Sequence, residues 1–113
     1  MINTNKPMIH LVLKAKWFEM IYSGIKLVEY REIKQYYGRL FACGQIKING
    51  IYYEADQVNI CFHLGYGKLR PTMLFACEGL SIGVGNPAWG VVDGVPYYRL
   101  DLGKMLQVAN YRL

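Results

Sequence analysis

The sequence predicts a small, mainly β domain of the α+β class, folded as a mostly antiparallel barrel with one to two short helices at its side. Several segments of strand length alternate apolar and polar residues, which is the pattern of half-buried strands. Twelve glycines and ten tyrosines favour strands and tight turns over a helical bundle. A length of 113 residues allows one hydrophobic core, so residues 1–113 are expected to form a single domain.

The chain begins with a predicted strand followed by a helix. Residues 8–13 (MIHLVL) are an apolar run of strand length and predict a buried strand. Residues 14–23 predict a short helix, because apolar side chains recur at spacings of three and four. These side chains are Trp17, Met20 and Ile21. Gly24 follows where a glycine in the left-handed conformation commonly ends a helix.

A second strand is expected over residues 27–33 (LVEYREI). Its period of two places Glu29 and Arg31 on one face. Residues 35–41 (QYYGRLF) are aromatic and contain a glycine, which predicts a loop or one helical turn.

The clearest hairpin signal lies between residues 45 and 54. Two short alternating segments flank Asn49-Gly50, a pair that readily adopts the positive φ angles of a type I′ turn. Residues 58–64 then alternate again and predict a half-buried strand.

The second half of the chain predicts two more strands and a long loop. The strands are expected at residues 72–81 and 97–102, and the loop, with four glycines and two prolines, at 83–96. The tail, residues 104–113, is compatible with a short closing helix.

Composition excludes two broad classes of protein. A hydrophobic fraction of 53% with 19% charged residues excludes an intrinsically disordered chain. No apolar run approaches the ~18 residues of a membrane-spanning helix, so no membrane partner is expected. The first ten residues lack the apolar stretch of a signal peptide, which predicts a cytoplasmic protein. The net charge of +5 suits a phosphate-bearing partner but equally serves solubility.

Spacing of the candidate ligands provides no metal-binding signal. Cys43, Cys61 and Cys77 are widely separated, and His10 and His63 are not spaced as zinc ligands. We therefore expect no metal site and no cofactor.

Ionisable residues gather between Gly24 and Arg31. Lys26, Glu29 and Arg31 lie within six residues at the edge of an apolar segment, where they would line a pocket. The alternative is a solvated strand face with an internal ion pair.

The segment GIKLVEYR, residues 24–31, fits the GxKxxExR signature of the ASCH domain, a small relative of the PUA domain. The preceding WFEMIYSG resembles the family's helix, and FHLGYG at 62–67 is similar to its aromatic strand and Gly-Tyr turn. The resemblance implies a PUA-like β-barrel with a cleft beside the helix. It further implies that Lys26, Glu29 and Arg31 line this cleft and that the partner is RNA or a nucleoside or nucleotide ligand.

The resemblance also implies an alternative function, a small metal-free hydrolase. One branch of the family hydrolyses N4-acetylcytidine with the signature lysine, a threonine and a later glutamate. Here Glu29 stands at the threonine position, and Glu78 is the plausible counterpart of the later glutamate. The candidate catalytic residues are thus Lys26, Glu29 and Glu78, for an amidohydrolase or a ribonuclease. A protein-interaction module is a third possibility.

The loop at residues 65–71 (GYGKLRP) is a second candidate binding element. Its glycines allow close backbone approach, Tyr66 offers a stacking face, and Lys68 and Arg70 offer phosphate contacts. The alternative is an ordinary turn with charged tips. Trp17 is expected in the contact between helix and barrel, and Trp89 as an anchor of the long loop.

Overall fold

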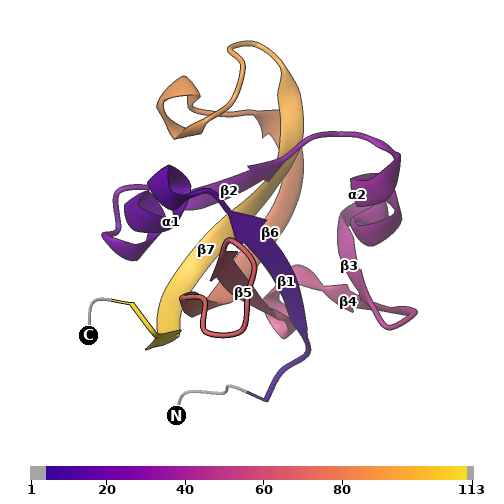
Figure 1. Cartoon of the computed structure of the whole chain (residues 1–113). Coiled ribbons are helices and arrows are strands. Elements are labelled where there is room, and N and C mark those ends of the chain that lie inside the picture. Colours follow the sequence, from indigo (N-terminus) through magenta and orange to yellow (C-terminus); the bar gives the residue numbers. More distant parts are fainter. Residues whose placement is uncertain (1–4, 112–113) are drawn as a thin grey trace.

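Five strands form one mixed sheet in the computed structural model, which describes residues 5–111 (Figure 1). The order across the sheet is β1-β5-β6-β7-β2. The bounds are β1 (Met8–Leu13), β5 (Asn59–Leu64), β6 (Thr72–Val84), β7 (Pro96–Ala109) and β2 (Val28–Arg31). The mainly β class predicted from the sequence is confirmed. The sheet is mixed because β1 pairs with β5 in parallel, whereas the other neighbours are antiparallel.

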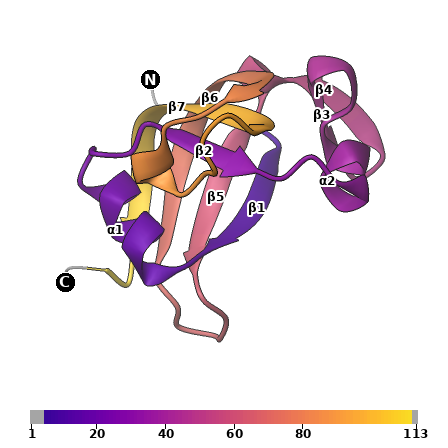
Figure 2. The same ribbon diagram turned by 90° about the horizontal axis from the view of Figure 1, so that it is seen from above.

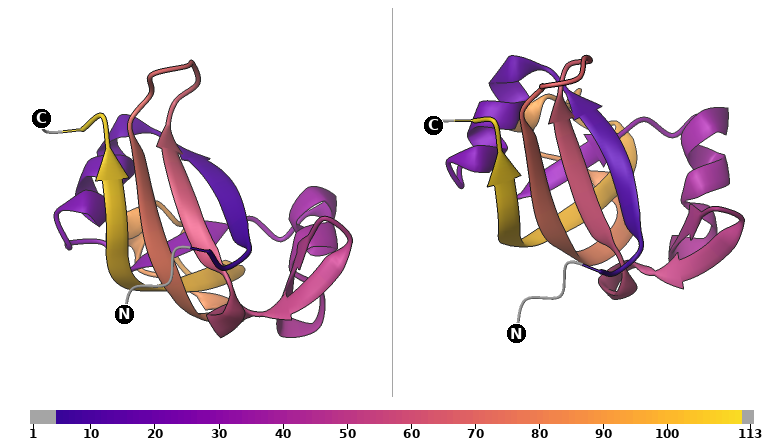
Figure 3. Two further views of the ribbon diagram at one scale, coloured as in Figure 1. Left: turned by 90° about the horizontal axis from the view of Figure 1, so that it is seen from below. Right: turned by 60° about the horizontal axis from the view of Figure 1, so that its bottom comes forward.

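A closed barrel is not found among the described strands, because β1 and β2 stay edge strands without backbone pairing to each other. The sheet is nevertheless strongly curled, as the long bent ribbons of β6 and β7 show (Figures 1 and 3). Register shifts between Leu74 and Gly79 accompany this bend, as expected for β-bulges. A side chain links the two edges: Arg31 Nη2 on β2 donates to the Val12 carbonyl on β1 at 3.1 Å.

Helix α1 (Ala15–Tyr22) packs at the side of the curled sheet (Figure 2). Its amphipathic spacing buries Phe18 and Ile21 completely or nearly so. Gly24 has a φ of +81°, as the sequence predicts for the residue that ends this segment. The core lies between α1 and the concave face of the sheet, around the fully buried Phe62, Met73 and Leu100.

The predicted hairpin is present as a separate two-stranded sheet of β3 (Gln45–Ile48) and β4 (Ile51–Glu54). Asn49 and Gly50 both have positive φ angles, +51° and +81°, as a type I′ turn requires. The hairpin and the short helix α2 (Gln35–Leu40) stand to one side of the main sheet (Figure 2). Three single 3₁₀ turns complete the elements of the described residues, at Ala42–Gly44, Ala55–Gln57 and Pro87–Trp89.

The expected closing helix at residues 104–113 is wrong within the described residues. Strand β7 continues through this segment to Ala109, which pairs with Thr72 of β6. The backbone hydrogen bonds of a long neighbouring strand outweigh the weak helical pattern of the tail. Residues 112 and 113 lie outside the described part of the chain. Between residues 5 and 111, no helix has both the length and the apolar character needed to cross a membrane.

Candidate functional site

Lys26, Glu29 and Arg31 form a charged cluster that is mostly buried. The turn after α1 places Lys26, whose backbone N–H donates to the Met20 carbonyl at 2.9 Å. Edge strand β2 then projects Glu29 and Arg31 on one face, with Glu29 opposite Leu100 of β7. Lys26 is 2% exposed and Glu29 is 4% exposed. The alternative interpretation of this segment, a solvated strand face, is therefore wrong.

Glu29 joins the two cations of the cluster. Lys26 Nζ donates to Glu29 Oε1, while Arg31 Nε donates to Glu29 Oε2 at 3.0 Å and Arg31 Nη2 lies 2.7 Å from the same oxygen. Both carboxylate oxygens thus accept charged hydrogen bonds, which are the strong class. One negative charge faces two positive charges, so the cluster carries an excess charge of +1.

Arg31 also ties the cluster to two other elements. Its Nη1 donates to the Tyr37 hydroxyl of α2 at 3.0 Å, and its Nη2 donates to the Val12 carbonyl of β1. Burial lowers the pKa of Arg31, but the Glu29 carboxylate and the Tyr37 hydrogen bond outweigh it and leave the pKa above its ordinary value. The guanidinium is therefore a permanent cation at the junction of β1, β2 and α2.

A cavity of about 520 Å³ opens onto this cluster. Besides the cluster, its lining contains two further lysines, Lys14 and Lys34, and a group of aromatic rings. The rings are Trp17, Tyr30, Tyr37, Trp89 and Tyr97. Four cations and two carboxylates, Glu29 and Glu32, line the cavity, which leaves an excess of two positive charges. Lys26 Nζ lies 5.6 Å from the Trp17 ring centroid and 5.7 Å from that of Tyr30, within cation–π range.

The loop between β6 and β7 forms one wall of the cavity at Gly90, and Gly85 of the same loop packs against the lining residue Tyr30. A Cβ on Gly90 would lie 2.7 Å from Trp17 Cζ2, and one on Gly85 would lie 2.5 Å from Tyr30 Cε1. Only glycine lets the backbone approach the rings this closely. Trp17 and Trp89, expected as core and loop anchor, therefore both line the cavity. The punctuated loop was visible in the sequence, but which rings its glycines would contact was not.

A second cavity, of about 740 Å³, lies beside the first and shares five lining residues with it, among them Arg31 and Tyr37. Tyr66 of the 65–71 loop lines this second cavity, as does His10. Tyr66 thus shares a cavity with Arg31 but does not line the cavity that contains Lys26 and Glu29. Lys68 is exposed and lines neither of the two cavities.

Arg70, the other loop cation, lines neither cavity. Its Nε donates to His63 Nδ1 at 2.8 Å and its Nη1 donates to the Gly67 carbonyl. The phosphate contacts expected of Lys68 and Arg70 therefore do not converge with Lys26 and Arg31 in this structure.

Glu78 is also placed apart from the cluster. It is exposed on β6, its Cγ approaches Gly103 of β7, and it lines neither cavity. The carboxylate that contacts Lys26 is instead Glu29, which both cations already occupy. A general base must have an oxygen available for the proton it removes. The cluster is better arranged to bind an anion than to remove a proton.

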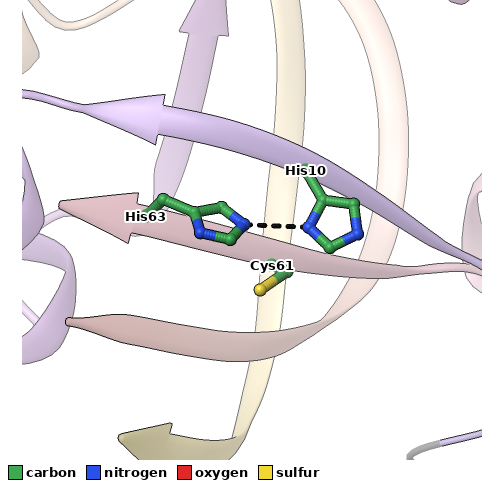
Figure 4. Close-up of side chains that lie close together, drawn as sticks. All are labelled: His10, Cys61 and His63. Carbon is green, nitrogen blue, oxygen red and sulfur yellow. Dashed lines mark hydrogen bonds between the residues drawn. The ribbon is translucent and has the colours of Figure 1, made fainter. Parts of the chain in front are cut away.

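A second group of chemically active side chains lies on the outer face of the sheet (Figure 4). His10, Cys61 and His63 come from the paired strands β1 and β5, with His10 opposite Cys61. Their spacing along the sequence carries no metal signal, because parallel pairing of distant segments brings the three together. Burial, Arg70 and His10, in that order of effect, lower the pKa of His63 below its ordinary value. Burial raises the pKa of the Cys61 thiol, although Arg70 opposes this effect.

Comparison with known proteins yields no relative from which a role could be transferred: no family model, curated protein or solved structure matches the chain significantly.

Proposed function

We propose that this chain binds RNA or a nucleotide-like ligand in the cavity beside the Lys26–Glu29–Arg31 cluster. The observation that carries the proposal is the combination of a buried, net-positive cluster with a wall of aromatic rings in one cavity. Cations suit a phosphate, and rings provide stacking surfaces for a base. A volume of about 520 Å³ lies within the usual range of small-molecule sites, roughly 300–1,000 Å³.

Each group has a role in this proposal. Lys26 and Arg31 attract the phosphate, and Glu29 holds the two cations in place. Trp17, Trp89 and the tyrosines offer surfaces for the base.

The ASCH-type, PUA-like assignment is part of the same proposal. Two features support it: the strongly curled sheet with α1 at its side, and the link between its edge strands. That link is made by Arg31, itself a residue of the GxKxxExR signature. In this view the signature arginine has a structural role as well as a binding role.

The hydrolase alternative is less well supported by the geometry. Glu29 is occupied by two cations, and Glu78 lies exposed outside the cavity. The proposal is therefore binding without catalysis, and incubation with N4-acetylcytidine is expected to yield no cytidine.

Intrinsic tryptophan fluorescence tests the proposal directly, because both tryptophans of the chain line the cavity. We expect cytidine monophosphate and a short single-stranded RNA to change the emission, and cytidine to bind more weakly. A hydrogen bond to a charged group contributes about 1.5–3 kcal/mol, so loss of the phosphate should weaken binding by about tenfold or more.

A matched pair of variants locates the site. Lys14→Gln combined with Lys34→Gln removes two exposed cations of the cavity and should weaken monophosphate binding. Lys104→Gln, which replaces an exposed cation on β7 outside the cavity, should not. Equal binding of nucleoside and nucleotide, or equal effects of the two sets of variants, would contradict the proposal.

A further inference from the structure

The outer face of the sheet carries a cluster independent of the proposed nucleotide cavity. The buried apolar residues of β1 and β5 alternate with its members and point into the core, so His10, Cys61 and His63 point outward. Register places His10 opposite Cys61, and His63 follows two residues later on the same face. Figure 4 shows the two imidazoles facing each other across their hydrogen bond, with the Cys61 thiol beside them.

The ligand atoms of these three side chains are close enough to share one ion. All lie within 4.8 Å of one another, and His10 Nδ1 is 2.8 Å from His63 Nε2. Ligands of tetrahedral zinc lie about 2.0–2.3 Å from the metal, hence roughly 3.3–3.6 Å from one another. Side-chain rotations that move the ligand atoms by about 1 Å would bring the three atoms to that spacing. His10 is exposed and has room for such a rotation.

We propose that His10, Cys61 and His63 form a zinc-binding site whose fourth ligand is water. Two imidazoles and one thiolate match the donor preferences of Zn²⁺. His10 also lines the second cavity, which leaves open space beside the site for a water ligand. Three protein ligands with one open position are the usual arrangement of a site that binds a further molecule, whereas structural zinc sites have four protein ligands.

Hydrogen bonds fix where the protons of the two imidazoles lie in this cluster. Arginine has no acceptor, so Arg70 Nε must donate to His63 Nδ1, at 2.8 Å. His63 then carries its single proton on Nε2 and donates it to His10 Nδ1, at 2.8 Å. The proton thus occupies the edge of the ring at which zinc would bind.

Zinc binding therefore requires three changes at this cluster. The Cys61 thiol loses its proton to solvent, the His63 proton moves from Nε2 to Nδ1, and Arg70 leaves the now protonated Nδ1. Arg70 belongs to the exposed 65–71 loop, whose Tyr66 is 88% exposed and Leu69 82% exposed. Movement of that loop can release Arg70 without disturbing the sheet. Arg70 is thus a competitor of the metal, both as a hydrogen-bond donor and as a neighbouring positive charge.

The experiment uses tag-free protein. Calorimetry measures the binding of Zn²⁺, and absorption spectroscopy measures the binding of Co²⁺. We expect one saturable site per chain and a thiolate-to-cobalt charge-transfer band. Cys61→Ser should abolish the band, while Cys43→Ser, which removes an exposed thiol elsewhere, should leave it unchanged. Zn²⁺ should also protect Cys61 from alkylation.

Two further variants test the ligand set without disturbing the core. His10→Ala alters an exposed side chain and should weaken Zn²⁺ binding by more than the roughly 10- to 100-fold typical of changes to the residues that orient metal ligands. Arg70→Gln removes the competitor and supplies an amide oxygen that can accept from His63 Nδ1, so binding should tighten by about tenfold. Lys68→Gln is the matched control, because it removes a charge from the same loop away from the cluster.

Three outcomes would overturn the proposal: no saturable binding of Zn²⁺ or Co²⁺, a charge-transfer band that survives Cys61→Ser, or unchanged affinity in His10→Ala. An Arg70→Gln variant that binds Zn²⁺ no more tightly than Lys68→Gln would refute the competing role of Arg70. Tryptophan fluorescence with cytidine monophosphate is read separately, so failure of either proposal leaves the other testable.

Discussion

The two charged or metal-ligating clusters of this molecule differ in how the chain builds them. The Lys26–Glu29–Arg31 cluster comes from six consecutive residues and is mostly buried, with the Glu29 carboxylate paired to both cations. The His10–Cys61–His63 cluster joins strands about fifty residues apart and lies on the outer face of the sheet. The first depends on local backbone geometry, whereas the second exists only when β1 pairs with β5 in the observed register.

Because of this difference, the two clusters should contribute differently to the stability of the fold. Loss of one partner from the buried cluster leaves a charge without its counter-ion in a desolvated place. Loss of one member of the outer cluster removes a neutral side chain and leaves no unpaired charge in the core, although His63 itself is only 8% exposed. Substitutions in the buried cluster should therefore lower the free energy of unfolding more than substitutions in the outer cluster. The outer cluster can then bind a ligand with little cost to stability.

Among the variants compared, Glu29→Gln should lower the free energy of unfolding the most. Removing one partner of a buried ion pair typically costs about 3–5 kcal/mol, and here two cations lose their shared carboxylate. Glu32→Gln is the matched control, because Glu32 lies 3.8 Å from Lys34 with both side chains mostly exposed. Such exposed pairs contribute about 0–1 kcal/mol. Urea unfolding of both variants measures the difference, and similar free energies of unfolding would contradict it.

The same contrast explains how much of the structure the sequence predicted. The Asn49-Gly50 hairpin and the Gly24 turn followed from local φ requirements, and Lys26, Glu29 and Arg31 were found through a local motif. The outer cluster was not found, because no local pattern reports a parallel pairing between distant strands. The tail was mispredicted where register shifts in the β6–β7 pair disturb the period-two pattern on which strand prediction depends.

The three cysteines differ in burial, and their reactivities therefore report on the interior and the surface of the molecule. Cys43 is exposed, Cys61 is partly buried, and Cys77 is buried in β6, where burial raises its pKa to about 11. Because the thiolate is the reactive form, its population at Cys77 in mildly alkaline buffer should be lower than for an ordinary thiol by about 100-fold or more. We expect alkylation in the order Cys43, Cys61, Cys77, followed by mass spectrometry of the native protein. Rapid modification of Cys77 would contradict this order.

Gly90→Ala tests the wall of the cavity beside the Lys26–Glu29–Arg31 cluster. Its φ of +98° strains any other residue, and its new Cβ would lie 2.7 Å from Trp17 Cζ2. Gly94→Ala carries a similar strain at φ +78° but meets no atom within 4 Å. Both should lose about 1 kcal/mol of stability from the backbone. Only Gly90→Ala should displace Trp17 and change both the emission spectrum and nucleotide affinity, so equal spectra would contradict the close packing of the wall.

Lys68→Gln should have the smallest effect, and it addresses a sequence-based expectation that the geometry leaves without support. Lys68 was expected to bind phosphate, but it is exposed and lines neither cavity. Removing one cation that binds a phosphate should reduce the slope of log K against log salt by about 0.7 for a single-stranded ligand. We expect the combined Lys14→Gln and Lys34→Gln variant to reduce that slope with a short RNA, and Lys68→Gln to leave it unchanged. A reduced slope in Lys68→Gln would show that the RNA interface extends from the cavity to the 65–71 loop. The same loop would then contact RNA through Lys68 and the outer cluster through Arg70.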